Sequence, residues 1–269
     1  TKVKPGTDRE GKPNDQTTPE KFLETFKTSL SRLQMDYVDI LYVHDVSNPE
    51  FLEYKPLINE VKKLKKEGKA KFIGFSTHKN EPAVISAAAD KSDWDVILTS
   101  YNYKQAYVNE LTAAIKKAGA AGIGIVAMKT IPGGGFLDRE KTKPINTTAA
   151  IKWALSNPDV CTTIPGMTSF DQLELNVKIL EDIALSEKEK TDLVADNSEP
   201  GLFCSGCRQC IPACPHNLPV PDLMRAYMYA YGYSQPSLAK ELIHELGISG
   251  NPCGNCDVGN VQCSRNFPV

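Results

Sequence analysis

Residues 37–75 have the sequence YVDILYVHDVSNPEFLEYKPLINEVKKLKKEGKAKFIGF, in which two apolar runs flank a lysine-rich segment. The run 37–43 has the length and the continuous apolar character of a buried strand. Residues 56–67 place apolar side chains at helical spacing, and Gly68 predicts the end of that helix. Residues 71–75 form the second strand. A strand, a helix and a strand in this order predict parallel pairing with a crossover helix.

The same alternation extends along most of the chain. Thr18 and Pro19 predict an N-cap and a first helical position, and apolar side chains then recur at helical spacing up to residue 33. Further strands are expected at 96–99, 123–127 and 160–164, with helices at 81–90, 108–117, 148–156, 170–180 and 187–195. This pattern predicts an α/β fold with a parallel sheet. It leaves a doubly wound sheet and a barrel both open.

Composition excludes several classes of protein. The 269 residues are 41% hydrophobic and 24% charged, which suits an ordinary folded core rather than a disordered chain. The net charge of -2 lacks the basic excess that is typical of nucleic-acid-binding domains. We expect no membrane span, because no run of about eighteen apolar residues occurs, and we see no secretory leader.

Cysteines divide the chain into two parts. Seven of the eight lie between Cys204 and Cys263, and Cys161 alone precedes them. We therefore predict a body over 1–197 and a cysteine-rich domain over 198–269. A body with a single cysteine suits a reducing, cytoplasmic compartment, where clustered cysteines favour a metal or a cluster over disulfides.

The first cysteine group has the spacing C-x2-C-x2-C-x3-C-P over residues 204–215, which is typical of bacterial [4Fe–4S] ferredoxins. Two-residue gaps let three thiolates point inward around one cluster. Four-cysteine zinc sites usually take two separated pairs, so zinc and disulfides are the weaker alternatives. The predicted ligands are Cys204, Cys207, Cys210 and Cys214.

The second group repeats this spacing with Gly259 in place of one cysteine. Since the fourth cysteine of each run ligates the other cluster in two-cluster ferredoxins, the spacing assigns Cys204, Cys207, Cys210 and Cys263 to one cluster and Cys214, Cys253 and Cys256 to the other. Three thiolates hold a three-iron cluster, or a four-iron cluster completed by Asp257 or solvent. A vestigial second site with a single cluster is the alternative. We expect helices near 221–231 and 237–246 between the groups, with tyrosines at 227, 229, 231 and 233 in a core or a docking surface.

Five ordered motifs within residues 1–195 resemble the aldo-keto reductases. They are Tyr42-Val43-His44-Asp45, Gly74-Phe75-Ser76-Thr77-His78, Ser100-Tyr101-Asn102, Ala127-Met128-Lys129 with Gly133-Gly134, and Ile164-Pro165-Gly166-Met167 with Asn176. One branch of that family carries a ferredoxin-like tail, which the region from Cys204 to Cys263 resembles. The resemblance implies an α/β fold: an incomplete (β/α)8 TIM-type barrel, from strand three or four to strand eight, followed by a small α-helical iron–sulfur domain.

The resemblance further implies hydride transfer between NADP(H) or NAD(H) and a small carbonyl or alcohol substrate, with an electron-transfer protein as a further partner. Lys2 and His44 match the family's catalytic lysine and histidine, and the alternatives are a solvated lysine and a hydrogen-bonded strand-end histidine. The family's aspartate and tyrosine acid precede the lysine. We therefore expect this sequence to be a fragment of a longer protein, the alternative being a complete chain with an open sheet.

Contacts to the nicotinamide nucleotide are implied in the same way. Ser76 and Asn102 would face the carboxamide, and Met128 would replace a stacking aromatic ring. The family's glutamine corresponds to Leu98, which removes one amide contact. The adenine and phosphate end would lie near a helix N-terminus, against Gly166, Met167, Ser169, Gln172 and Asn176. Lys178 is the nearest base, so the choice between NADPH and NADH stays open.

A second class of function also fits the sequence. Clusters accept single electrons whereas nicotinamide delivers a hydride, and no flavin motif that would connect the two is visible. The chain would then be a catalytically degenerate redox or interaction module that presents a ferredoxin-like tail.

Overall fold

The computed structural model of the chain describes residues 1–8, 10–91, 93–132, 145–167, 169–198, 204, 208–232, 235–253, 256 and 261–263. These form two compact units. Unit 1 comprises Thr1–Asn102, Tyr107–Thr130 and Ile151–Ile183, and unit 2 comprises Tyr103–Ala106, Ile131–Ala150 and Ala184–Val269. The division between residues 197 and 198 stays a prediction. Several residues singled out in the sequence lie outside the described part: Gly133, Gly134, Cys207, Tyr233, Asp257 and Gly259.

Unit 1 is built on a parallel sheet whose strand order follows the chain order. Its six strands are β1 (Lys2–Val3), β2 (Val38–Val43), β3 (Ala70–Thr77), β4 (Val96–Ser100), β5 (Gly124–Met128) and β6 (Thr162–Thr163). In a doubly wound sheet the order reverses at a switch point. The observed order excludes that architecture for the described strands and matches the winding of a (β/α)8 barrel.

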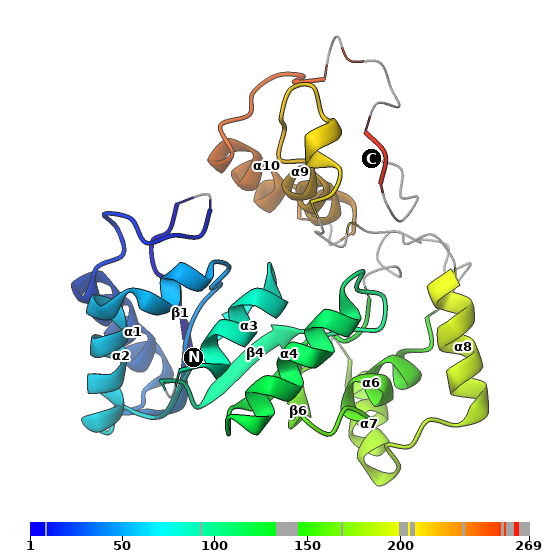
Figure 1. Ribbon diagram of the computed structural model, residues 1–269, viewed down its shortest axis with the longest axis horizontal. Helices are drawn as coiled ribbons and strands as arrows, with labels where there is room; N and C mark the ends of the chain where they lie inside the picture. Colours follow the sequence, from blue (N-terminus) through cyan, green and yellow to red (C-terminus); the bar gives the residue numbers. More distant parts are fainter. Residues whose placement is uncertain are drawn as a thin grey trace. The chain divides into compact units, whose positions relative to one another are not determined.

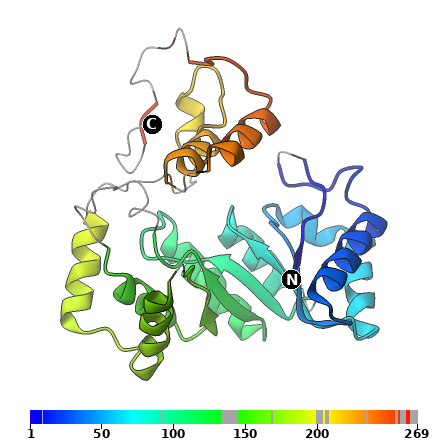
Figure 2. The same ribbon diagram turned by 180° about the vertical axis from the view of Figure 1, so that it is seen from behind.

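The helices of unit 1 follow the predicted alternation. They are α1 (Pro19–Leu33), η1 (Pro49–Glu53), α2 (Lys55–Lys66), α3 (Glu81–Ala89), α4 (Val108–Ala120), α7 (Phe170–Lys178) and η2 (Ile179–Glu181), and α6 (Thr147–Leu155) runs into this unit from unit 2. Figure 1 shows α3 and α4 in front of the sheet, and Figure 2 shows the strands from behind. Right-handed crossovers between successive neighbours place their helices on one face.

Side chains alternate between the two faces of the sheet. On the helix-covered face, Leu41, Phe75 and Ile97 join the main core and are fully buried. On the opposite face, Tyr42, Val96 and Leu98 form a smaller cluster, against which Ile40, Val126 and Met128 pack. Both faces are apolar, as expected of barrel strands.

Two residues of the sequence, Thr18 and Gly74, have clear local roles in the structure. Thr18 caps α1, because its side-chain oxygen accepts a hydrogen bond from the backbone N–H of Lys21 at 3.3 Å, and Pro19 is the first helical residue. Gly74 permits the close approach of β3 to β4, since a Cβ there would lie 1.9 Å from the carbonyl oxygen of Val96.

Two sequence-based strand assignments needed correction. The predicted strand 160–164 is reduced to the two residues of β6, and the short β1 makes six strands where five were expected. Two-residue strands cannot be recognised from a local apolar run, because their pairing depends on the neighbouring strand.

In the part of the chain that the structure describes, no helix is long and apolar enough to cross a membrane.

The last part of unit 2 is helical, with α8 (Glu187–Ser198), η3 (Ile211–Ala213), α9 (Val220–Tyr227), the π-helical η4 (Met228–Gly232) and α10 (Pro236–Glu245). The helix predicted over 221–231 thus changes its winding at Met228. The rings of Tyr227 and Tyr231 lie 4.6 Å apart, and both side chains are exposed. These two tyrosines therefore belong to a surface and not to a core.

Candidate functional site at the strand ends

The candidate site lies at the carboxyl ends of the parallel strands, where the residues that follow each strand meet at one edge of the sheet. The backbone N–H of His44, after β2, donates to the carbonyl oxygen of Val3 on β1 at 2.8 Å. The pairing places Lys2 opposite Tyr42. Lys2 and His44, distant in sequence, are therefore brought to neighbouring strands.

His44 is half-buried and electrostatically coupled to the lysines around it. Burial is the largest effect, and it lowers the pKa of His44; the charge of Lys2 is the next largest and acts in the same direction. Lys4 and Lys129 lower this pKa further, whereas Asp45 raises it. The imidazole is therefore neutral near pH 7 and keeps one N–H as a hydrogen-bond donor.

Asp45 connects the ends of β2 and β3. It adopts the left-handed conformation with φ of 66°, and its backbone N–H donates to the side-chain oxygen of Ser76 at 3.1 Å. The next N–H, of Val46, donates to the carbonyl oxygen of Ser76 at 2.8 Å. These bonds hold Ser76, which is 1% exposed, at the edge of the sheet.

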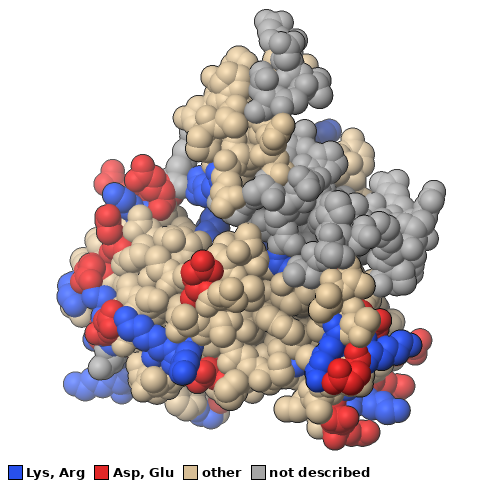
Figure 3. All heavy atoms as spheres, turned by 45° about the vertical axis from the view of Figure 1, so that its right-hand side comes forward, with Lys and Arg blue, Asp and Glu red and all other residues tan. Residues whose placement is uncertain are grey.

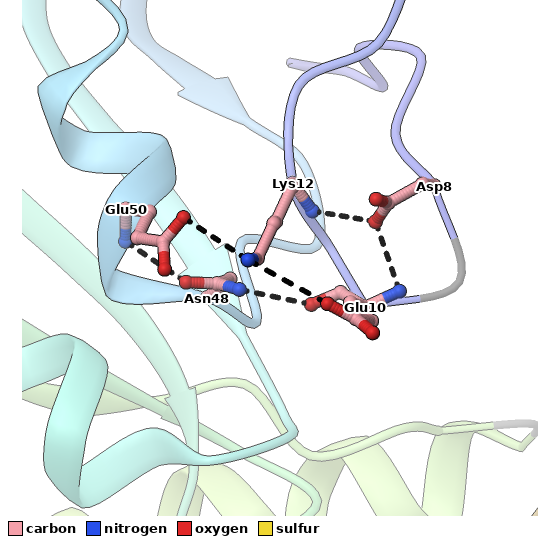
Figure 4. Close-up of polar contacts among 5 residues, drawn as sticks. All are labelled: Asp8, Glu10, Lys12, Asn48 and Glu50. Atoms are coloured by element: carbon pink, nitrogen blue, oxygen red, sulfur yellow. Dashed lines mark hydrogen bonds and ion pairs between the residues drawn. The ribbon is translucent and has the colours of Figure 1, made fainter.

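The loop that leaves β1 is held against the segment that follows His44 by polar contacts (Figure 4). Lys12 lies 3.3 Å from the carboxylate of Glu50, and Asn48 donates to the carbonyl oxygen of Glu10 at 3.2 Å. Asp8 accepts from the backbone N–H of Lys12 at 2.8 Å. The Glu50 carboxylate raises the pKa of Lys12. Such exposed pairs orient a loop but contribute little stability.

Asn102 follows β4 and is tied to the end of β5. Its side-chain Nδ2 donates to the carbonyl oxygen of Lys129 at 3.1 Å, and the N–H of Tyr101 donates to that of Met128 at 3.0 Å. Asn102 is 7% exposed, whereas Met128 is half-buried. Lys129 adopts a left-handed conformation with φ of 54°. Ser76, Asn102 and Met128 thus lie at or just beyond the ends of three successive strands.

The segment after β6 is more open. A Cβ at Gly166 would meet no atom within 4 Å, and Met167 is 44% exposed. The side-chain oxygen of Ser169 caps α7 by accepting from the N–H of Gln172 at 3.3 Å. Asn176 is half-buried on the same helix. This arrangement offers room and backbone N–H groups to a phosphate.

The structure describes six of the tail cysteines: Cys204, Cys210, Cys214, Cys253, Cys256 and Cys263. Cys210 is buried, and the N–H of Leu218 donates to the Sγ atom of Cys214 at 3.5 Å. No group of three or more potential metal-ligating side chains is gathered among the described residues, and Cys207 lies outside them. The predicted cluster ligands are therefore not brought together in this part of the structure.

Sequence reasoning assigned no role to two polar residues around the site, His78 and Glu81. His78 lies with Nδ1 3.4 Å from Oδ1 of Asp45, and Glu81 is completely buried. Glu81 is the first residue of α3, where an acidic side chain ordinarily faces solvent and favours the helix dipole. Nothing in the local pattern distinguishes it from such a residue. The contact between Asp45 and His78 depends equally on strand pairing.

Charged side chains on one face of the molecule are of both signs and interspersed (Figure 3). In unit 1, Lys65 pairs with Asp95 and Lys71 with Asp39, both at 2.7 Å. This distribution agrees with the small net charge of -2, and the described residues drawn in that view form no extended basic surface.

Residues 1–149 match the model of the aldo/keto reductase family. An L-galactose dehydrogenase from Arabidopsis thaliana is 26% identical over 212 residues, covering 65% of this chain and 64% of that protein. An NADH-specific methylglyoxal reductase from Escherichia coli is 26% identical, covering 65% and 63%. The chain thus spans less than two thirds of these relatives. An aldo-keto reductase structure from Bacillus halodurans superposes with a TM-score of 0.53 at 22% identity, covering 66% and 67%, which supports the fold.

Proposed function

Because this chain belongs to the aldo/keto reductase family, we propose that it is an NAD(P)H-dependent oxidoreductase that interconverts a small carbonyl compound and its alcohol. One observation carries this proposal: His44, with its lowered pKa, lies within the electrostatic reach of Lys2 at the strand ends. Two relatives, a dehydrogenase and an NADH-specific reductase, support the class of reaction.

The residues at the strand ends fit a nicotinamide nucleotide. Ser76 and Asn102 are buried polar side chains that would hold the carboxamide, and Met128 would lie against the ring. The open space at Gly166 and the helix start at Ser169 suit the other end of the nucleotide, whose contacts we assign to Gly166, Met167, Ser169, Gln172 and Asn176. When bound, the nucleotide would supply the hydride, and the oxyanion formed on the substrate would take its proton from solvent.

His44 and Lys2 would act on the carbonyl group of the substrate. The neutral imidazole of His44 donates its N–H to the carbonyl oxygen and so orients it. The ammonium group of Lys2 contributes positive charge close to the oxygen on which negative charge develops. Burial of His44 strengthens both effects, because a medium of lower dielectric constant weakens electrostatic interactions less than water does.

The test is a fluorescence titration of the full chain with NADPH and with NADH, followed by turnover of a panel of aldehydes, ketones and alcohols. We expect one nucleotide to bind, and His44→Gln to lower kcat/KM about a hundredfold with little change in nucleotide affinity. His244→Gln, at an exposed position on α10, is the matched control. Failure to bind either nucleotide would contradict the proposal and favour the degenerate redox module.

For the tail we propose an iron–sulfur domain over residues 198–269, with Cys204, Cys207, Cys210, Cys214, Cys253, Cys256 and Cys263 as ligands. Clustered cysteine thiolates, and the N–H donated to Cys214, fit the chemistry of cluster ligation. They also suit a reducing compartment such as the cytoplasm. A soluble electron-transfer protein is the partner that we propose for this domain.

Iron and acid-labile sulfide per chain, measured after anaerobic purification, test the tail. About seven or eight irons would indicate two clusters, and about four would indicate one. Cys204→Ser should lower the iron content, whereas Cys161→Ser, at an exposed position outside the tail, should leave it unchanged. Iron near zero in the wild-type chain with intact thiols would refute the cluster.

A further inference from the structure

Glu81 is a buried acid that the proposed mechanism does not use. It is the first residue of α3 and has no exposed surface. The hydroxyl of Ser100 donates to its Oε1 atom at 2.5 Å, and the hydroxyl of Tyr107 donates to its Oε2 atom at 2.9 Å. Both carboxylate oxygens therefore have a hydroxyl donor from another element.

These two donors stand at the two ends of one segment. Ser100 is the last residue of β4, and Tyr107 immediately precedes α4. The segment between them begins with Tyr101 and Asn102, the strand-end residue that we assign to the nicotinamide carboxamide. A single carboxylate thus holds both ends of the connection that carries Asn102.

A carboxylate is costly to bury, even where it is hydrogen-bonded, and an apolar side chain of similar size would fill the same space. Asn102 is itself held by the carbonyl oxygen of Lys129, which accepts from Nδ2. Its position is therefore fixed by the residue that follows β5 and by the contact of Glu81 with Ser100, two residues earlier in the chain. These contacts specify the geometry of the strand end as well as its packing.

We propose that Glu81 is a positioning residue, which acts through Ser100 to hold Asn102 in the orientation that binds the nicotinamide carboxamide. This inference rests on the proposed oxidoreductase function. Glu81 itself contacts neither substrate nor nucleotide. Loss of the Glu81 contacts should therefore weaken nucleotide binding more than an equal loss of stability elsewhere in the chain does.

The experiment compares NADPH and NADH dissociation constants of the full chain with those of four variants. Glu81→Leu should weaken binding at least about tenfold, and Glu81→Gln should restore most of it, because a carboxamide still accepts one of the two bonds. Ser100→Ala should weaken binding more than Tyr107→Phe does, since Ser100 lies nearer to Asn102 in the chain. If Glu81→Leu does not fold, Ser100→Ala carries the test.

Phe26→Leu is the stability-matched control, because it perturbs the core at α1 and should lower Tm without weakening binding. Unchanged affinity in Glu81→Leu or Ser100→Ala, in a wild-type chain that binds nucleotide, would overturn the inference. NMR of the nucleotide-free chain distinguishes a failure of the positioning inference from a failure of the proposed oxidoreductase function. The side-chain amide resonances of Asn102 should shift in Glu81→Leu; no shift would refute positioning, whereas absent binding by the wild-type chain would refute the proposed function.

Discussion

The Oδ1 atom of Asp45 lies 3.4 Å from Nδ1 of His78, so residues that follow two neighbouring strands lie close together at the candidate site. Oδ1 is buried and accepts no hydrogen bond among the described residues, and its contact with His78 is an ion pair only when that imidazole is protonated. The same aspartate raises the pKa of His44, against the lowering effect of burial and of Lys2. Strand pairing therefore sets the electrostatics of this site.

Removal of the Lys2 charge should raise the pKa of His44. In Lys2→Met one positive charge that disfavours imidazolium is lost, and the NMR titration of the His44 ring should move to higher pH. Lys4→Met should produce a smaller rise, because its effect on His44 is weaker. Lys71→Met, which removes a lysine paired with Asp39, serves as the control. An unchanged His44 titration in Lys2→Met would contradict the coupling.

His44 should make the folded state less stable in acid. Because its pKa is lowered in the folded chain, the unfolded state binds more protons as the pH falls below about 6.5, the ordinary histidine pKa. The free energy of unfolding should then decrease until the folded pKa is passed. His44→Gln should flatten this part of the profile in urea unfolding measured from pH 8 to 5, and His244→Gln should not.

Gly74→Ala should destabilise the sheet strongly. The added Cβ would meet the carbonyl oxygen of Val96 at 1.9 Å, which forces β3 and β4 apart. We expect a loss of about 2 kcal/mol or more. Gly124→Ala is the matched control in β5, where the nearest atom would lie at 3.6 Å. Equal unfolding free energies for the two variants would contradict this account of β3–β4 packing.

Phe26→Ala should create a cavity beneath α1. Phe26 is completely buried, and its truncation should cost about 3–5 kcal/mol in the free energy of unfolding. Phe170→Ala on α7 removes the same side chain at a position that is 82% exposed, and should change stability by about 0.5 kcal/mol or less. Chemical denaturation of the two variants checks the contrast. A similar loss in both would show that α7 is covered in solution.

The site residues at the strand ends could be predicted from the sequence, because polar residues of catalytic type follow the apolar runs. The resemblance to the aldo-keto reductases assigned roles to His44 and Ser76. His44 comes directly after 37–43 and Ser76 directly after 71–75, and parallel pairing brings such strand ends together. Glu81 and His78 gave no comparable signal. An acid at a helix start and a histidine after a strand have ordinary surface explanations, and only contacts across elements distinguish them.

The sequence by itself determined the type and approximate extent of most elements, since capping at Thr18 and apolar periodicity act over a few residues. Tertiary structure decided the strand order, the two-residue pairings of β1 and β6, the burial of Glu81 and the lowered pKa of His44. These properties arise from contacts between residues that are distant in the chain. The free energies of these contacts depend on which strands become neighbours, and no local sequence pattern encodes which strands do so.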